Sequence, residues 1–188
     1  PVVNLFTQSG GKLKFRDEDQ VFIPDTYPSD QISIGSCNGE FTLDEILSSI
    51  SKKLKDFLNI KKTEYENLEI QSHFNKTKRN IWLLPSDKII GKTKPFVDYQ
   101  NDATAKDIKL ALREGFRSIE HVKRYTTTGM GTDQGKLGNM HALGIISETA
   151  GSKMGELGTT TFRPPYTPLT VWGNLQDDRA AKPFMGEQ

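Results

Sequence analysis

A polar stretch in the second half of the chain limits the possible fold more than any other feature. Residues 123–136 read KRYTTTGMGTDQGK, with four threonines, three glycines and Met130 as the one aliphatic side chain. Such a segment cannot form part of a hydrophobic core, yet segments with helical periodicity precede and follow it. We therefore expect an exposed loop that is held at both ends by helices and presents hydroxyl groups and backbone amides.

Capping residues and apolar spacing define the helices around this loop. Thr104 is predicted to cap a helix with Asp107 at its third position, and Gly115 is predicted to end it. A two-turn helix is predicted over 118–125, and a third helix over about 139–149. The second half of the chain is thus expected to be a compact helical unit.

The amino-terminal part is predicted to combine β structure with one long helix. Residues 10–15 and 20–24 form two short apolar-alternating runs around a charged turn, which is typical of a hairpin. Residues 31–41 are predicted to form a strand that ends in a glycine turn. A capping box of Thr42 and Glu45 then begins a helix. Its apolar positions are Leu43, Ile46, Leu47, Ile50, Leu54, Phe57 and Leu58.

This order of strand, glycine turn and helix is the one by which dinucleotide-binding units present backbone amides at a helix N-terminus. Gly35 and Gly39 do not complete the full glycine fingerprint, and no acidic partner for a ribose can be placed. An ordinary strand-to-helix turn explains the same residues. The expected fold class is α+β in either case.

Composition excludes several classes of protein and site. Lys and Arg number 25 against 24 Asp and Glu, so no basic field indicates nucleic-acid binding. The single Cys37 excludes an internal disulfide or a four-thiolate metal site, and a small turn residue is its simplest interpretation. No apolar run reaches the roughly 20 residues of a membrane span. A cytoplasmic location is expected, and the start at Pro1 indicates a processed or excised piece.

Several longer runs resemble a known family. EHVKRYTTTGM, TDQGK and TTTFRPPYTP resemble the α subunit of heterotetrameric sarcosine oxidase and its relatives, and the resemblance covers nearly all of the chain. It implies that residues 1–58 close a dinucleotide-binding domain, 59–80 form a linker, 81–170 form a small helical flavin-interface domain and 171–188 form a tail. The family's amino-terminal dinucleotide fingerprint and its folate-binding aminomethyltransferase domain are absent, so we expect a fragment or truncated subunit.

The helical domain also resembles the two-iron two-sulfur module of the bacterioferritin-associated-ferredoxin type. On that resemblance, the four cluster-ligand positions are Asp98, Gln100, Thr132 and Gly135. None of these residues is a thiolate, which such clusters need. The resemblance therefore implies that a former cluster-binding loop now has another function, and that the chain holds neither a cluster nor a structural metal.

What the resemblance implies about cofactors follows from the family's complex. There sarcosine is oxidised at FAD on the β subunit, electrons pass to FMN at the α/β interface, and tetrahydrofolate receives the one-carbon unit. A phosphate needs amide, hydroxyl and cationic donors. The expected FMN contacts are Arg124, Thr126, Thr127, Thr128, Gly129, Gly131, Gln134 and Lys136. The expected contacts in a partial NAD site are Ser36, Phe41 and Leu43.

No catalytic residue is expected on this chain, so the isolated chain should not turn over an N-methyl amino acid. The expected partners are the β subunit and the other subunits of the complex, and neither nucleic acid nor membrane is among them. FAD and tetrahydrofolate belong to the complex but not to this chain.

Other interpretations of the same residues stay open. The loop at 123–136 is also explained as a solvated turn between helices, and the whole chain as a ligand-free assembly domain or as a ferredoxin-type electron-transfer module. His73 is expected to face water, and His121 to be a half-buried helix residue rather than a flavin neighbour. Residues 162–168, FRPPYTP, are expected to form a rigid strut or subunit contact, since proline fixes φ.

Overall fold

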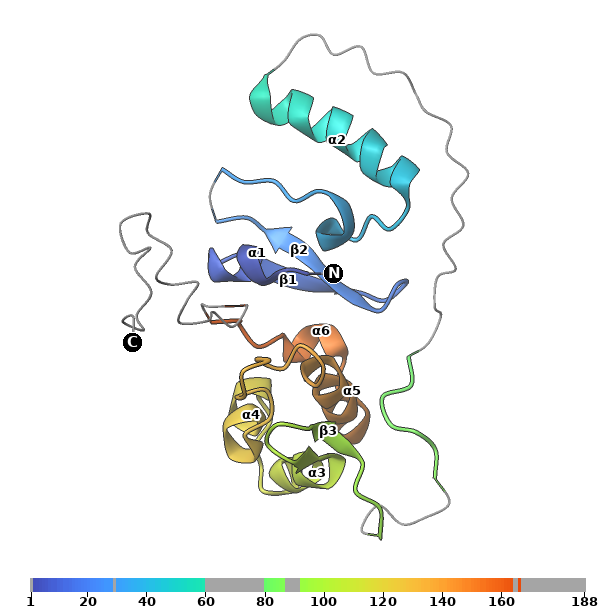
Figure 1. Cartoon of the computed structure of the whole chain (residues 1–188), viewed down its shortest axis with the longest axis vertical. Coiled ribbons are helices and arrows are strands. Elements are labelled where there is room, and N and C mark those ends of the chain that lie inside the picture. Colours follow the sequence, from blue (N-terminus) through green and yellow to red (C-terminus); the bar gives the residue numbers. More distant parts are fainter. Residues whose placement is uncertain (1, 29, 60–79, 87–91, 164–165, 167–188) are drawn as a thin grey trace, which may run out of the picture.

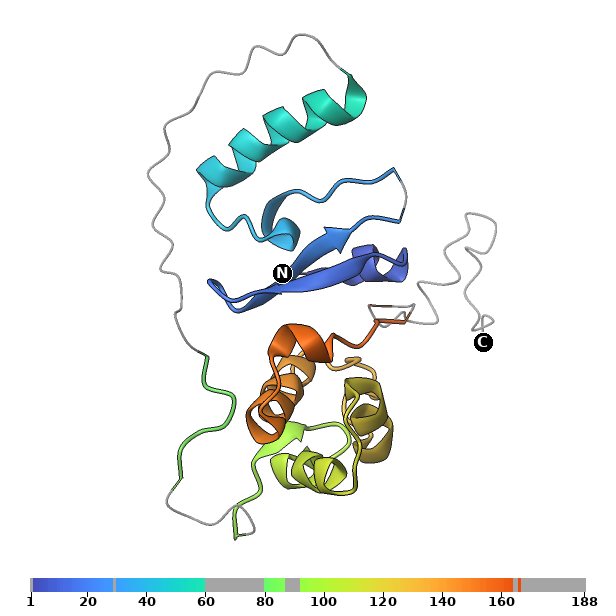
Figure 2. The ribbon, with the colours of Figure 1, turned by 180° about the vertical axis from the view of Figure 1, so that it is seen from behind.

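A computed structural model describes residues 2–28, 30–59, 80–86, 92–163 and 166. An amino-terminal part packs onto a helical unit, with a β-hairpin between the helical unit and the longest helix (Figures 1 and 2). The elements of the amino-terminal part are α1 (Asn4–Gln8), β1 (Lys12–Arg16), β2 (Val21–Thr26), the 3-10 helix η1 (Gly35–Asn38) and α2 (Leu43–Leu58). The elements of the helical unit are β3 (Phe96–Asp98), β4 (Ala103–Thr104), α3 (Ala105–Arg113), α4 (Ile119–Thr126), α5 (Asn139–Ala150) and α6 (Met154–Leu157).

The predicted hairpin is confirmed. β1 and β2 pair antiparallel, and Phe15 and Phe22 lie opposite each other with ring centroids 5.0 Å apart. The helix α1 in front of it was not predicted, because the run before the hairpin looked like β structure. The ring of Phe6 anchors α1, since it fills the space next to Gly11 that any Cβ there would occupy. Phe6 also packs edge-on against Tyr27 at 5.0 Å.

The strand predicted over 31–41 is wrong. Residues 31–34 pair with no strand of the described part, and residues 35–38 form η1. The carboxylate of Glu40 accounts for this turn, because it accepts hydrogen bonds from the Gly35 amide and the Asn38 side chain, both at 2.8 Å. Gly39 then reverses the chain at φ 77°. The expected strand-turn-helix unit of a dinucleotide-binding domain is therefore reduced to a turn and a helix.

The predicted start of α2 is confirmed by a complete capping box. The Glu45 amide donates to the Thr42 hydroxyl, and the Thr42 amide donates to the Glu45 carboxylate at 3.2 Å. Polar side chains attach α2 to the turn before it: Ser49 and Lys53 both donate to Glu40, at 2.6 and 3.0 Å. No residue of α2 is buried. The apolar stripe of this helix is thus only partly covered, since Ile46, Ile50 and Leu54 are half-buried while Leu43, Leu47, Phe57 and Leu58 are exposed.

The three predicted helices of the second half are confirmed to within about two residues. Thr104 and Asp107 form the predicted capping box of α3, and Gly115 lies in the left-handed region, two residues after the last residue of the helix. The short hairpin β3–β4 and the helix α6 were not predicted. The polar connector predicted at 59–80 lies, except for its two ends, outside the described residues, as do His73 and the tail 171–188.

The hydrophobic core lies among α3, α4 and α5 and reaches into the hairpin. Its largest fully buried side chains are Ile108, Val122, Leu143, Ile145 and Ile146. Phe22 of β2 belongs to the same cluster, and Trp82 packs against it directly over Gly144 of α5. α6 contacts β1, which joins the two ends of the described chain. Within the described part, no helix is long and apolar enough to cross a membrane.

Candidate functional site

The loop between α4 and α5 begins with a left-handed residue and is built around two buried threonines. α4 ends at Thr126, and the next residue, Thr127, has a φ of 60°. Thr126 and Thr128 point into the molecule with exposed fractions of 9% and 2%. Their hydroxyl oxygens lie 2.7 Å apart, and Thr126 also donates to the Val122 carbonyl at 2.8 Å. These two hydroxyls therefore hold the loop onto α4.

A buried carboxylate ties the middle of the loop to β3. Asp98 is 5% exposed, and the Gly129 amide donates to its Oδ2 at 2.6 Å. The amides of Gln100 and Asn101 and the side chain of Asn101 donate to the same carboxylate at 2.8–3.2 Å. Burial alone raises the pKa of Asp98, but these hydrogen bonds outweigh burial and hold its pKa below the ordinary value. Asp98 is thus a charged anchor for both segments.

Gln100 makes a second link between the same two segments. Its Nε2 donates to the Thr132 hydroxyl at 2.9 Å, and its Oε1 accepts from the Asp133 amide at 3.2 Å. Gly131 needs to be glycine, because a Cβ there would overlap the Gln100 side chain. The structure thus brings three of the four predicted cluster-ligand positions into one hydrogen-bonded junction.

The fourth position lies further along the loop. Gly135 has φ 75° and packs against the Asn139 side chain. Among the described residues, no group of three His, Cys, Asp or Glu side chains is placed to hold a metal ion.

The last part of the loop holds the segment that follows α6. Asn139 donates to the Gln134 carbonyl at 3.2 Å and to the Thr160 hydroxyl at 2.9 Å. The Arg163 amide donates to Gln134 Oε1 at 2.9 Å. Lys136 donates to the Tyr166 carbonyl at 2.7 Å, and its ammonium lies 4.0 Å from the centre of the Tyr166 ring. The loop therefore clamps the returning chain through four side-chain contacts.

A cavity of about 410 Å³ opens beside this clamp, between the helical unit and the hairpin. Gly135, Lys136 and Asn139 form part of its wall, and Tyr166 closes part of it. The rest of the lining is largely apolar and includes Phe22. An apolar cavity with a few polar groups at one wall is the usual form of a small-molecule site.

The eight residues predicted to contact FMN separate into two groups. Arg124, Thr127 and Lys136 are exposed, and Gly131 is half-buried. The other four make contacts inside the protein that fix the shape of the loop; they are Thr126, Thr128, Gly129 and Gln134. The eight predicted contacts therefore combine surface residues with residues that support the loop from within.

The three residues predicted to contact NAD lie in the segment that runs from η1 to the first residue of α2. Ser36 is exposed in η1, Phe41 is half-buried, and Leu43 is 51% exposed. The Phe41 amide donates to the Glu45 carboxylate at 3.0 Å. The carboxylate of the capping box therefore already binds amides that a dinucleotide phosphate would use.

The remaining single-residue predictions have plain outcomes. His121 is exposed rather than half-buried. Cys37 is a half-buried turn residue whose thiol donates to the Ile34 carbonyl at 3.1 Å. Sequence reasoning missed the roles of Asn139 and Tyr166, which no local pattern marks. The position of Asn139 at the first residue of a helix after a glycine-rich loop was the one available signal.

Comparison with known proteins gives consistent matches. Residues 92–174 match the family described as the sarcosine oxidase A3 domain. The chain is 34% identical over 176 residues to the sarcosine oxidase subunit alpha of Corynebacterium sp. (strain P-1), a match that covers 90% of this chain and 18% of that protein. It is 53% identical over 90 residues to the sarcosine oxidase subunit alpha of Rhizobium meliloti (strain 1021), covering 48% of this chain and 9% of that protein.

The fold also has a match among solved structures. L-proline dehydrogenase from P. horikoshii superposes with a TM-score of 0.59 over 92% of this chain and 36% of the other, at 19% sequence identity. At that identity the match concerns the fold alone. The chain spans 18% or less of the length of the sarcosine oxidase subunits named above.

Proposed function

Because residues 92–174 belong to the sarcosine oxidase A3 domain family, and 90% of the chain aligns with a sarcosine oxidase α subunit, we propose that this chain acts as part of a flavoenzyme complex of that type. The complex oxidises an N-methyl amino acid, and this chain contributes one side of an FMN cradle that a β subunit completes. FMN, when bound, supplies a redox centre that accepts and passes on electrons. No residue of this chain touches the amino acid.

The observation that carries the proposal is the way the loop is held. Asp98 fixes its middle from inside, Gln100 fixes the same part at the surface, and the buried Thr126–Thr128 pair fixes its start. The outer side therefore keeps a defined shape, although the Thr127 hydroxyl and the Lys136 ammonium also donate to carbonyls of the chain, those of Thr126 and Tyr166. A preorganised row of donors is what a phosphate or a flavin edge needs, because little ordering remains to be done on binding.

The two groups of predicted residues receive different roles in this proposal. The contacts to the cofactor come from Gly131, Thr127 and Lys136, with Arg124 at the margin. Thr126, Thr128, Gly129 and Gln134 support these contacts from inside the loop. This chain contacts only one side of the cofactor, so the partner subunit must supply the other side of the cradle. Each hydrogen bond to a charged phosphate contributes roughly 1.5–3 kcal/mol once water is excluded.

Lys136 provides the test of the cradle. In the full complex, Lys136→Met should weaken FMN retention or slow electron transfer from FAD to FMN, while the reduction of FAD by substrate stays nearly unchanged. Lys12→Met, which removes an exposed lysine from β1, is the matched control. FMN content and rapid-reaction absorbance measure the two effects. Retention of FMN with wild-type transfer in the Lys136 variant would remove this residue from the cradle.

We further propose that Ser36, Phe41 and Leu43 form the edge of an NAD pocket whose larger part lies in sequence outside this chain. The capping box already engages the nearby amides, which favours contact with a ring or ribose over contact with a phosphate. The isolated chain should then show no NAD binding at the micromolar level, about −8 kcal/mol. Calorimetric titration of the chain with NAD measures this.

The wider setting of the chain is part of the same proposal. FAD and tetrahydrofolate are placed in other parts of the complex, the isolated chain is inactive, and the complex is cytoplasmic. The loop between α4 and α5 is proposed to be an altered cluster-binding loop, since hydrogen bonds join Gln100 to Thr132 and Asp98 to Gly129 where a ferredoxin-type module has thiolates. An electron-transfer role of this chain through its own cluster is disfavoured for the same reason.

One observation favours a second candidate function, that of an assembly domain without a ligand. Lys136 and Gln134 bind the segment around Tyr166, so their donors and acceptors already have partners within the chain. On this alternative the loop is a clamp for the returning chain, and FMN content would not respond to Lys136→Met. The same variant would instead lower the thermal stability of the chain.

A further inference from the structure

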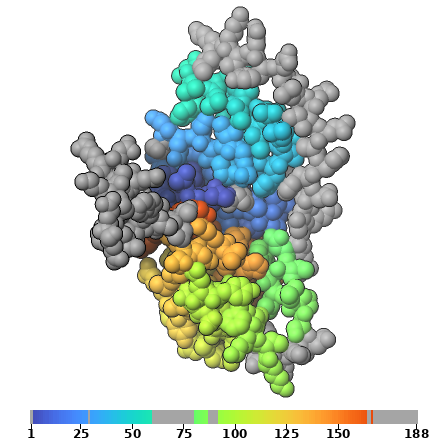
Figure 3. All heavy atoms as spheres, in the orientation of Figure 1, coloured from blue at the N-terminus to red at the C-terminus, as the bar shows by residue number. Residues whose placement is uncertain are grey.

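A groove of about 710 Å³ lies on the helical unit, and Trp82 lines both this groove and the cavity beside the clamp. Residues 81–86 form one of its walls and residues 93–99 another, and the start of α5 completes it. Figure 3 shows residues 80–86 lying along the side of the helical unit. The base of the groove is firm, because Trp82 packs directly on Gly144 and both Val97 and Ile145 are buried.

Large apolar side chains surround this groove, although they face solvent. Each of the five is between 40% and 80% exposed; they are Ile81, Leu84, Phe96, Tyr99 and Leu137. Single exposed apolar residues are normal on a protein surface, but a continuous group around a concave surface indicates a site of interaction. Phe96 and Tyr99 add aromatic rings, which are enriched at the centres of protein interfaces.

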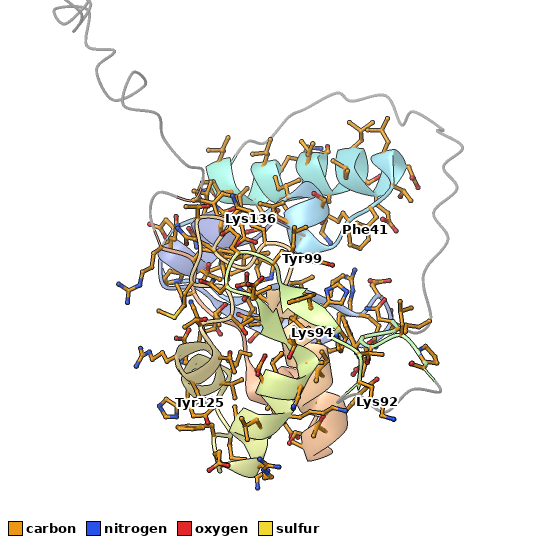
Figure 4. All side chains as sticks on the ribbon, turned by 60° about the horizontal axis from the view of Figure 1, so that its bottom comes forward. Phe41, Lys92, Lys94, Tyr99, Tyr125 and Lys136 are labelled. Atoms are coloured by element: carbon orange, nitrogen blue, oxygen red, sulfur yellow. The ribbon has the colours of Figure 1, made fainter. Side chains whose placement is uncertain are left out.

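The charge at the groove has one sign. Of the described residues that line it, none is acidic, and Lys94 carries a positive charge. The neighbouring Lys92 is exposed as well. Neither lysine forms an ion pair with a described residue. In Figure 4, Lys92, Lys94 and Tyr99 follow one another along one side of the helical unit. A ligand that fills the groove should therefore present a carboxylate beside its apolar groups.

The groove is continuous with the loop between α4 and α5. Tyr99 lines the groove, and the next residue, Gln100, binds Thr132 of the loop at 2.9 Å. Leu137 lines the groove and directly follows Lys136. A protein that covers the exposed side of the loop thus has the groove at its margin.

We propose that the groove binds an apolar, carboxylate-bearing segment of the partner subunit, with its apolar side chains between Leu84 and Tyr99 and its carboxylate at Lys94. This inference rests on the proposed function, because it takes the occupant to be the subunit that completes the cofactor cradle. It adds a contact region for that subunit which does not touch the cofactor.

The main test is Leu84→Asp in the full-length α subunit, with the purified β subunit as the probe. Leu84 is 80% exposed, so the change should leave the α subunit folded. A buried unpaired carboxylate in the interface should weaken association on the order of tenfold or more. Leu5→Asp is the matched control, because Leu5 is 76% exposed but lies in α1, outside the groove. Association is measured by sedimentation or by a surface-binding assay.

A second pair of variants tests the charge. Lys94→Glu should weaken association severalfold at low salt, and the difference from wild type should shrink at high salt, where the charges are screened. Lys12→Glu should change association little at either salt concentration. A loss that does not depend on salt, or an equal loss in both lysine variants, would overturn the assignment of a carboxylate to the occupant.

Other occupants give different results, and each would overturn the proposal. If Leu84→Asp alters self-association of the α subunit and leaves β binding unchanged, the groove binds a second copy. If it lowers the melting temperature of the α subunit alone, and Leu5→Asp does not, the groove is covered by the subunit's own chain. Wild-type β binding by both groove variants also excludes the proposal.

The same measurements separate this inference from the cofactor cradle. FMN per assembled complex should stay at the wild-type level in the groove variants once the subunits are present at saturating concentration. Normal association of the groove variants, together with loss of FMN in Lys136→Met, would remove the groove and leave the cradle. Weak association of the groove variants, together with an FMN content that Lys136→Met does not change, would remove the cradle and leave the groove.

Discussion

The helical unit and the amino-terminal helix α2 have similar sequence patterns but differ in how far their apolar side chains are buried. α3 and α2 both begin with a complete capping box and both have an apolar stripe. Ile108 in α3 is fully buried, whereas Leu43 and Leu47 in α2 are 51% and 37% exposed. Helical periodicity therefore indicates which side of a helix is apolar, but not whether anything in the same chain covers it.

The contacts that hold α2 make the difference sharper. α2 attaches to the rest of the chain through the Glu40 carboxylate, to which Ser49 and Lys53 donate. Burial raises the pKa of Glu40, but the hydrogen bonds from Ser49, Gly35, Asn38 and Lys53 outweigh burial and leave its pKa lowered. The helical unit is thus stabilised by apolar burial, and α2 by polar contacts at its inner side.

The largest expected effect is at the centre of the helical unit. Leu143→Ala should lower the free energy of unfolding by about 2–5 kcal/mol, because it removes a side chain that is 1% exposed and leaves a cavity. The matched change Leu47→Ala on α2 should lower the free energy of unfolding by less than about 0.5 kcal/mol, apart from the change in helix propensity. Denaturant unfolding of the chain measures both. Equal losses would mean that the two regions do not differ as described.

The close packing on α5 gives the next effect. Gly144→Val should cost on the order of 1–3 kcal/mol, because the added side chain overlaps the Trp82 ring. In Gly155→Ala, the control on α6, the new Cβ meets only ordinary contact at 3.4 Å, and stability should be unchanged or slightly higher. Combining Gly144→Val with Trp82→Leu should recover part of the loss. A double variant with fully additive losses would show that Trp82 is not the cause.

The charged anchor of the loop gives an effect that depends on pH. Asp98→Asn should cost about 1–3 kcal/mol near neutral pH, because the amide keeps one acceptor and turns a donor toward the amides that Asp98 binds. The pKa of Asp98 is lowered in the folded state, so its contribution is present above the unfolded value of about 3.9 and is lost as pH falls below it. The difference in the free energy of unfolding between wild type and variant should therefore become smaller in acid. Unfolding curves at several pH values measure it, with Asp102→Asn as an exposed control.

The smallest effect is expected on the outer side of α2. Replacement of Leu43 and Leu47 by serine should change the stability of the chain by less than about 0.5 kcal/mol per site, apart from the lower helix propensity of serine. It should also reduce the binding of an apolar dye to the chain. A clear loss of stability would mean that part of this chain covers the stripe.

The sequence was sufficient wherever a local signal specified the element. The capping boxes at Thr42 and Thr104 placed two helices, and the charged turn placed the hairpin. The strand predicted over 31–41 failed because the side chain of Glu40 organises those residues into a turn, and no alternation of apolar residues contains that information. The loop was located correctly, but three successive threonines carry no period that says which of them face inward.

The rest of the candidate site depends on contacts between distant residues. Asp98 meets Gly129 across 31 positions, and Lys136 meets Tyr166 across 30. Only the tertiary structure brings these pairs together, so the sequence could supply the donors and acceptors but not their partners. The internal support that Thr126, Thr128, Gly129 and Gln134 give to the loop is seen only in the contacts that they make.

The contact between β1 and α6 has a consequence for the order of folding. The contacts of α3 with α4 and α5 join segments that are close in sequence, and such contacts close small loops and form quickly. β1 is made before the helical unit, and its partner α6 lies about 140 positions later in the chain. We therefore expect the helical unit to form first as the chain leaves the ribosome, and the hairpin to dock afterwards, which leaves Phe15 and Phe22 exposed to chaperones in the interval.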